Sequence, residues 1–248
     1  MEREADVSGI LGQTVEVLGA AGRAAITYVV VLGLFNGAGG LFGLASADDN
    51  FFSARFTDTM WETQTSSAPE ALFGVCSMLL FVIASYVLLT QMMAATGRPM
   101  RNGARFWSFV GMSILAMIGV MIGFVFLVIP GIVVLVRWSA ANGFVLTGEH
   151  GITGSLGASW EATDGHGLSI FGAGLVVWIA LAVLSSVVLG VAFAGVGSGG
   201  GTFSPLLGLA TAISGFTEAF GNAVSFAFSI AVFHLVAPAD TSVAEVLE

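Results

Sequence analysis

The stretch Ala71–Ala95 reads ALFGVCSMLLFVIASYVLLTQMMAA and contains no charged residue. A helix of about 20 apolar residues crosses the hydrocarbon core of a bilayer, which is about 30 Å thick. This stretch is therefore expected to form a membrane-spanning helix. The composition of the chain agrees, since 56% of its 248 residues are hydrophobic and 9% are charged, whereas soluble domains carry about 25% charged residues.

Five further apolar stretches accompany this one. They cover residues 24–45, 106–129, 131–147, 168–193 and 206–236. The stretch 131–147 is the shortest and contains Arg137, so its full crossing is left open. The stretch 206–236 would be about 46 Å long as a helix, so part of it must tilt, bend or lie outside the core. The expected fold is an all-α integral membrane protein, a single polytopic domain over residues 1–248 with about six transmembrane helices.

Two more segments carry apolar residues at helical spacing between polar ones. In residues 1–23 the stripe consists of Val7, Leu11, Val15 and Leu18; in residues 152–163 it consists of Ile152, Leu156 and Trp160. Amphipathic helices of this kind lie in the plane of the membrane surface. We expect two interfacial helices on the cytoplasmic side.

These two segments also resemble each other in sequence. VSGILGQTVE at residues 7–16 aligns without gaps to ITGSLGASWE at residues 152–161, an offset of 145 residues. Parallel repeats occur in membrane proteins, so the pattern predicts two copies of a surface helix followed by two spans. The alternative is coincidence, because 34 glycines make chance matches common.

Arginine placement predicts the orientation, because basic residues concentrate in cytoplasmic loops. Arg3, Arg23, Arg98, Arg101 and Arg105 lie before the first span or between the second and third, whereas Arg55 alone lies in the loop after the first span. Both termini, including the acidic tail at 237–248, are expected in the cytoplasm. A bacterial cytoplasmic (inner) membrane is the expected location.

Charge and cysteine content exclude several classes of protein. All seven basic residues are arginine and the net charge is −9, which excludes a nucleic-acid binder because such a protein needs a basic surface. The single cysteine excludes a disulfide framework and a cysteine zinc cluster. Glu149, His150, Asp164 and His166 share one loop, but their spacing matches no metal signature. We expect no cofactor, no metal and no enzymatic activity.

Two ionisable residues inside apolar stretches are candidate site residues. Arg137 either binds a lipid phosphate or another anion, or makes a structural ion pair or caps backbone carbonyls. Glu218 belongs to a polar stripe on one helix face, formed by Thr211, Ser214, Glu218, Asn222, Ser225 and Ser229. That stripe either carries a proton or cation or joins helices. Both charges are expected toward the outer half of the membrane, where they could form an ion pair.

Aromatic residues and glycines suggest contacts elsewhere. The loop 46–70 contains Phe51, Phe52, Phe56 and Trp61, which either anchor at the headgroups or dock a partner protein. Gly33 and Gly37, and likewise Gly119 and Gly123, are four residues apart and should let helix backbones approach closely.

Residues 127–172 resemble the YciC-like bacterial membrane proteins, a family related to the membrane domain of some glycerophosphoryl diester phosphodiesterases. The matching residues are Ile129-Pro130-Gly131, Val136-Arg137, and Ser159-Trp160 with Thr163 and Gly165. Asn142-Gly143 stands where the family often has proline, and we expect no attached phosphodiesterase domain. The resemblance implies a fold of about six spans and no established chemistry.

These observations favour a non-enzymatic accessory or scaffold protein of the cytoplasmic membrane or of a membrane complex. The alternative is a small transporter or lipid-handling protein that uses Arg137 and Glu218. The expected partners are membrane lipids, with a protein partner left open, and no nucleic acid.

Overall fold

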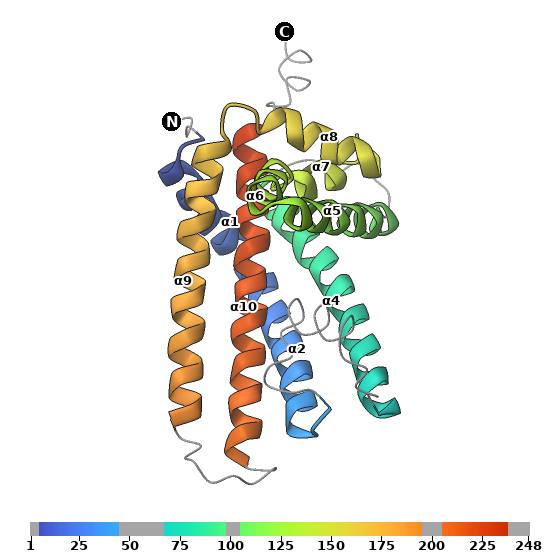
Figure 1. Ribbon diagram of the computed structural model, residues 1–248, viewed down its shortest axis with the longest axis vertical. Helices are drawn as coiled ribbons and strands as arrows, with labels where there is room; N and C mark the ends of the chain where they lie inside the picture. Colours follow the sequence, from blue (N-terminus) through green and yellow to red (C-terminus); the bar gives the residue numbers. More distant parts are fainter. Residues whose placement is uncertain (1–4, 45–66, 98–104, 195–204, 238–248) are drawn as a thin grey trace. The chain divides into compact units, whose positions relative to one another are not determined.

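The computed structural model describes residues 5–44, 67–97, 105–194 and 205–237, and the regular elements in these ranges are all helices (Figure 1). They are α1 (Val7–Ala20), α2 (Gly22–Leu41), α4 (Ala68–Ala95), α5 (Phe106–Phe126), α6 (Val128–Arg137), α7 (Ala141–Thr147), α8 (Ile152–Ala162), α9 (Gly167–Ala194) and α10 (Pro205–Val236). Within the described ranges, six helical stretches are long and apolar enough to cross a membrane. The chain is therefore an all-α, multi-pass membrane protein, as predicted.

The helices group into two compact units. Unit 1 comprises residues 1–17, 93–175 and 227–248, and unit 2 comprises residues 18–92 and 176–226. The long helices α4, α9 and α10 contribute residues to both units.

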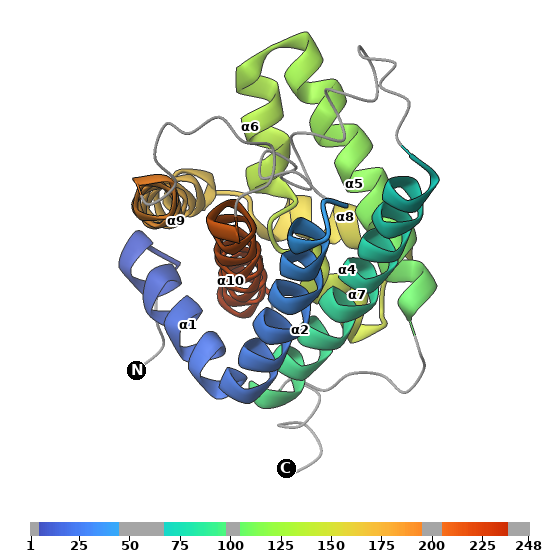
Figure 2. The same cartoon turned by 90° about the horizontal axis from the view of Figure 1, so that it is seen from below.

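In unit 2, α2 lies between α4 and α10 (Figure 2). The rings of Phe35 and Phe73 stack at 5.0 Å. Gly33 faces the ring of Phe216, and a Cβ at Gly37 would lie 3.1 Å from the backbone of Ala212. The expectation that Gly33 and Gly37 allow close helix packing is confirmed.

The third apolar stretch ends earlier than expected. Leu127 has extended backbone angles, φ −167° and ψ 150°, so α5 stops at Phe126 and α6 begins at Val128. Pro130 is the third residue of α6, where its missing N–H costs nothing because the first turn has no intrahelical acceptor. A Cβ at Gly123 would lie 2.9 Å from Cα of Gly131. The two helices therefore form a tight hairpin, and the expected packing role of Gly123 is confirmed.

The fourth apolar stretch is broken. Here α6 ends at Arg137, residues 138–140 form a turn, and α7 follows for seven residues. Trp138, the first residue of the turn, packs its ring against Gly119 of α5. Arg137 therefore lies at a helix end rather than inside a continuous helix.

Both predicted surface helices are present, and their buried residues agree with the predicted stripes only in part. In α1 the buried residues are Ile10, Thr14 and Val17, whereas Val15 is 71% exposed. In α8 they are Ser155, Leu156 and Ser159. The predicted stripe of α1 is therefore not its buried face, whereas Leu156 of the predicted α8 stripe is buried.

The start of α1 is capped by an acidic side chain. The backbone N–H of Gly9 donates to Asp6 Oδ1 at 2.6 Å, and the Ser8 hydroxyl donates to Asp6 Oδ2 at 2.9 Å. Such N-caps satisfy donors that have no partner in the first turn. The hydrogen bond from Gly9, followed by that from Ser8, lowers the pKa of the Asp6 carboxyl below its ordinary value.

Candidate functional site at the break between α6 and α7

Arg137 binds the end of α8 rather than extending into an apolar interior. Its guanidinium donates to Asp164 Oδ1 at 2.7 Å and to the carbonyl oxygen of Trp160 at 3.4 Å. The same guanidinium lies 5.5 Å from the centre of the Trp160 ring, within the range of a cation–π interaction. Because Trp160 lies in the last turn of α8, the positive charge also complements the negative end of that helix.

The two charges of this ion pair differ in exposure. The Arg137 side chain is 22% exposed and the Asp164 side chain 78%. The hydrogen bond from Arg137, together with its charge, lowers the pKa of the Asp164 carboxyl below its ordinary value. Asp164 is therefore ionised at neutral pH and keeps the charge of Arg137 balanced.

The backbone carbonyl of Arg137 is also bound by α8. It accepts a hydrogen bond from the Ser159 hydroxyl at 2.7 Å and a longer one from the Thr163 hydroxyl at 3.3 Å. The Thr163 hydroxyl makes its shortest hydrogen bond to the carbonyl of Ser159, at 2.8 Å. Carbonyls at a helix end have no intrahelical donor, and in an apolar environment an unsatisfied carbonyl is costly. The buried hydroxyls of Ser159 and Thr163 thus stabilise the point where the fourth stretch breaks.

The end of α10 binds the next part of the break in the same way. The Ser229 hydroxyl donates to the carbonyl of Ser139 at 2.6 Å, and Asn142 Nδ2 donates to Ser229 Oγ at 3.0 Å. We name the set Arg137, Ser139, Asn142, Ser159, Trp160, Thr163, Asp164 and Ser229 the helix-break site. It joins α6, α7, α8 and the last part of α10 within unit 1.

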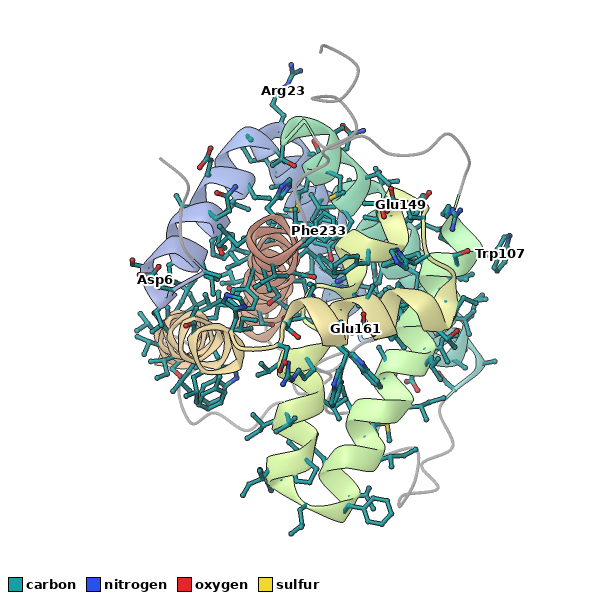
Figure 3. All side chains as sticks on the ribbon, turned by 90° about the horizontal axis from the view of Figure 1, so that it is seen from above. Asp6, Arg23, Trp107, Glu149, Glu161 and Phe233 are labelled. Carbon is teal, nitrogen blue, oxygen red and sulfur yellow. The ribbon has the colours of Figure 1, made fainter. Side chains whose placement is uncertain are left out.

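Close apolar packing surrounds these hydrogen bonds. Phe233 of α10 lies in the interior of unit 1 (Figure 3), where it faces Gly143 and meets Phe144 edge to face at 4.9 Å. Next to it the buried Nδ1 of His150 has no hydrogen-bond partner among the described residues. The backbone carbonyl of His150 accepts a hydrogen bond from Arg105 at 3.0 Å.

Glu218 lies in a different part of the molecule. It is a half-buried residue of α10 in unit 2, the unit in which the Tyr28 hydroxyl lies 3.4 Å from that of Ser85. Asn222 is half-buried, and the exposed Ser225 hydroxyl donates to the carbonyl of Gly221 in its own helix. The predicted site of Arg137, Glu218, Asn222 and Ser225 is thus divided between the two units, and the ion pair between Arg137 and Glu218 stays a prediction.

Two sets of predicted residues lie outside the described part of the chain. They are the loop aromatics Phe51, Phe52, Phe56 and Trp61, and the side chain of Thr211. Their proposed roles in anchoring, docking or helix association therefore stay predictions.

Sequence reasoning missed the partners of Arg137. From the sequence, Asp164 is only one of four loop residues without a metal signature, and Ser159 and Thr163 are only part of a family pattern. A signal for them was present, because Ser155, Ser159 and Thr163 recur every four residues and so share one helix face. A hydroxyl face on a surface helix indicates that the helix donates hydrogen bonds to the protein beneath it.

Part of the family resemblance, from Val136 to Gly165, meets at this place, whereas Ile129-Pro130-Gly131 lies at the other end of α6. Val136-Arg137 ends α6, Ser159-Trp160 and Thr163 bind it, and Gly165 adopts a positive φ of 78° in the following turn. Comparison of the chain with family models, with curated proteins and with solved structures finds no match.

Proposed function

We propose that this chain is a non-enzymatic accessory or scaffold protein of a bacterial cytoplasmic membrane, with both termini in the cytoplasm. The observation that carries the proposal is the binding of the Arg137 guanidinium by Asp164 and Trp160. A transporter or lipid-binding protein would use such a charge for its ligand. Here the charge fixes one helix of the protein to another.

The other polar groups of the helix-break site support the same conclusion. The hydroxyls of Ser159, Thr163 and Ser229 donate to backbone carbonyls, and Asn142 donates to Ser229. In unit 2 the Ser77 hydroxyl donates to Asn36 at 3.1 Å, which joins α4 to α2. Side chains used in this way hold helices together, as a scaffold requires.

The resemblance to the YciC-like proteins forms part of the proposal. Its support is that Arg137 is joined by hydrogen bonds to the motif residues Ser159, Trp160 and Thr163, through which α8 binds the end of α6. That arrangement gives these four residues a physical reason. We therefore propose that this part of the family pattern serves folding rather than catalysis.

The test is purification of the tagged protein from its native membrane in a mild detergent, followed by mass spectrometry of the proteins and lipids that accompany it. We expect a stoichiometric protein partner, whose identity would name the process. The matched variant is Arg137→Ala, which removes the guanidinium. If no protein accompanies the chain but a specific anionic lipid does, and Arg137→Ala loses that lipid, the scaffold function is wrong and lipid handling replaces it.

A further inference from the structure

The hairpin formed by α5 and α6 is apolar along its whole far part, including its turn. Residues 114–136 read ILAMIGVMIGFVFLVIPGIVVLV, without one charged or hydrogen-bonding side chain. Val125, in the last turn of α5, is 82% exposed, and Ile129 is 75% exposed. Turns in water are normally built from Gly, Pro, Asn, Asp and Ser. A turn of this composition is suited to hydrocarbon.

Helix α8 lies on the side of this unit that faces water. The exposed carboxylates of Glu149, Glu161 and Asp164 lie before, on and after it. Figure 3 shows Glu161 on the α8 ribbon, which crosses both helices of the hairpin. The crossing points are Gly111 of α5, where a Cβ would lie 2.6 Å from Ile152 Cδ1, and Arg137 of α6.

The part of the hairpin beyond α8 is too short to cross a bilayer. Helix α6 has 10 residues between the turn and Arg137, which is about 15 Å of helix. The hydrocarbon core is about 30 Å thick. Even if α6 were parallel to the membrane normal, the turn of the hairpin would therefore lie near the middle of the membrane.

The hairpin also lies crosswise to the end of α10 within unit 1 (Figure 1; Figure 3, which looks from above). Trp107, at the start of α5, is 78% exposed and points away from the unit at its edge (Figure 3). Tryptophan is enriched at the membrane–water interface. An exposed tryptophan at this position favours a hairpin that starts at the interface.

We propose that the α5–α6 hairpin enters and leaves the bilayer on the side of α8, and that its partner is the acyl-chain layer of that one leaflet. The helices α2, α4, α9 and α10 then cross the membrane. The hairpin increases the cross-sectional area of the protein in one leaflet only. The proposal goes beyond the scaffold function and does not depend on it.

The test uses single cysteines in a Cys76→Ala background. Leu127→Cys places a thiol at the turn of the hairpin, Glu161→Cys marks the side of α8, and Ser67→Cys, just before α4, marks the opposite side. A membrane-impermeant maleimide is applied to intact cells, to opened cells and to protein denatured in detergent. The two control variants identify the sides, so the result at the turn does not depend on the proposed orientation.

We expect Leu127→Cys to react only after denaturation. Reaction together with Ser67→Cys would show that the hairpin crosses the membrane, and reaction together with Glu161→Cys would show that it lies in water; either result overturns the proposal. A nitroxide on the same cysteine separates lipid from protein burial. We expect its relaxation to respond more to oxygen than to a water-soluble nickel chelate, and a weak response to both, as for a site covered by protein, would also overturn the proposal.

Discussion

At the residue scale, the carbonyl oxygen of Arg137 accepts two hydroxyl hydrogen bonds, from Ser159 at 2.7 Å and from Thr163 at 3.3 Å. We expect Ser159→Ala to lower the free energy of unfolding by about 1 kcal/mol, because the Thr163 hydroxyl can turn from the Ser159 carbonyl, at 2.8 Å, to the carbonyl of Arg137. Adding Thr163→Val should cost about 2–3 kcal/mol in total, since the carbonyl then has neither donor. Unfolding in mild detergent measures this.

The matched control is Ser186→Ala on α9. The Ser186 hydroxyl is exposed and donates only to the carbonyl of Ala182 in its own helix, so its loss should change the unfolding free energy by less than about 0.5 kcal/mol. If the double variant at Ser159 and Thr163 were as stable as this control, the two hydroxyls would not stabilise the helix break.

The ion pair between Arg137 and Asp164 predicts a pH dependence. Arg137 lowers the pKa of the Asp164 carboxyl in the folded state. A group with a lowered folded pKa contributes stability above its unfolded pKa, about 3.9 for aspartate, and loses it as the pH falls through the folded pKa. We expect Asp164→Asn to lower the melting temperature at pH 7 and to have no effect at pH values below the folded pKa.

Exchanging the charges of Arg137 and a candidate acid tests which acid forms the ion pair with Arg137. Because the guanidinium already binds Asp164, Arg137→Asp should be rescued by Asp164→Arg in the same chain. Arg137→Glu should not be rescued by Glu218→Arg. Rescue is measured as the folding stability of each double variant or as its abundance in the membrane. If only Glu218→Arg gave rescue, Arg137 would pair with Glu218, as expected from the sequence, and not with Asp164.

At the element scale, the place of α7 depends on close contact with α10. The space where a side chain would lie at Gly143 is filled by the ring of Phe233, so Gly143→Ala should cost about 1–3 kcal/mol through overpacking. The control is Gly157→Ala in α8, where a Cβ meets no atom within 4 Å. That change should stabilise the helix by about 0.5–1 kcal/mol, because glycine is a poor helix former. Equal effects in the two variants, measured by thermal unfolding, would contradict this packing.

The helices themselves could be predicted from the sequence more securely than their contacts. Long uncharged stretches fix where a helix can cross a membrane, and Ala71–Ala95 lies within the observed α4, Ala68–Ala95. The break at residues 138–140 could not be read in this way. Arg137 leaves the crossing of this stretch open but does not say where the helix ends, and the hydroxyls that bind the carbonyls at the break come from α8 and α10, far along the chain.

The candidate site shows the same limit. Arg137 was identified because a charge among apolar residues needs a partner, but its sequence position does not say which acid is close. The expected partner, Glu218, was chosen for sharing the outer half of the membrane. The early end of α6 instead brings Arg137 to the interfacial helix, where Asp164 is within hydrogen-bond distance.

At the scale of the whole molecule, the order of elements agrees with the predicted parallel repeat. α1 and α8 begin at Val7 and Ile152, and α2 and α9 begin at Gly22 and Gly167, both pairs at the predicted offset of 145 residues. The buried residues Ile10 and Thr14 of α1 have Ser155 and Ser159 of α8 at the same offset. The repeat itself stays a prediction, and it requires α1 and α8 to lie on one side of the membrane.

That requirement can be measured at two equivalent positions. Glu16 and Glu161 are related by the same offset, and both are exposed, so Glu16→Cys and Glu161→Cys should each label efficiently in a Cys76→Ala background. Between these two residues the chain crosses the membrane twice, through α2 and α4, and forms a hairpin that returns to its own side. An even number of crossings returns the chain to the same face of the membrane. We expect both cysteines to react at the same step with an impermeant maleimide, and Ser67→Cys at the other. If Glu16→Cys and Glu161→Cys were instead labelled from opposite sides, the repeat would have to be inverted. That result would contradict both the parallel duplication and the hairpin confined to one leaflet.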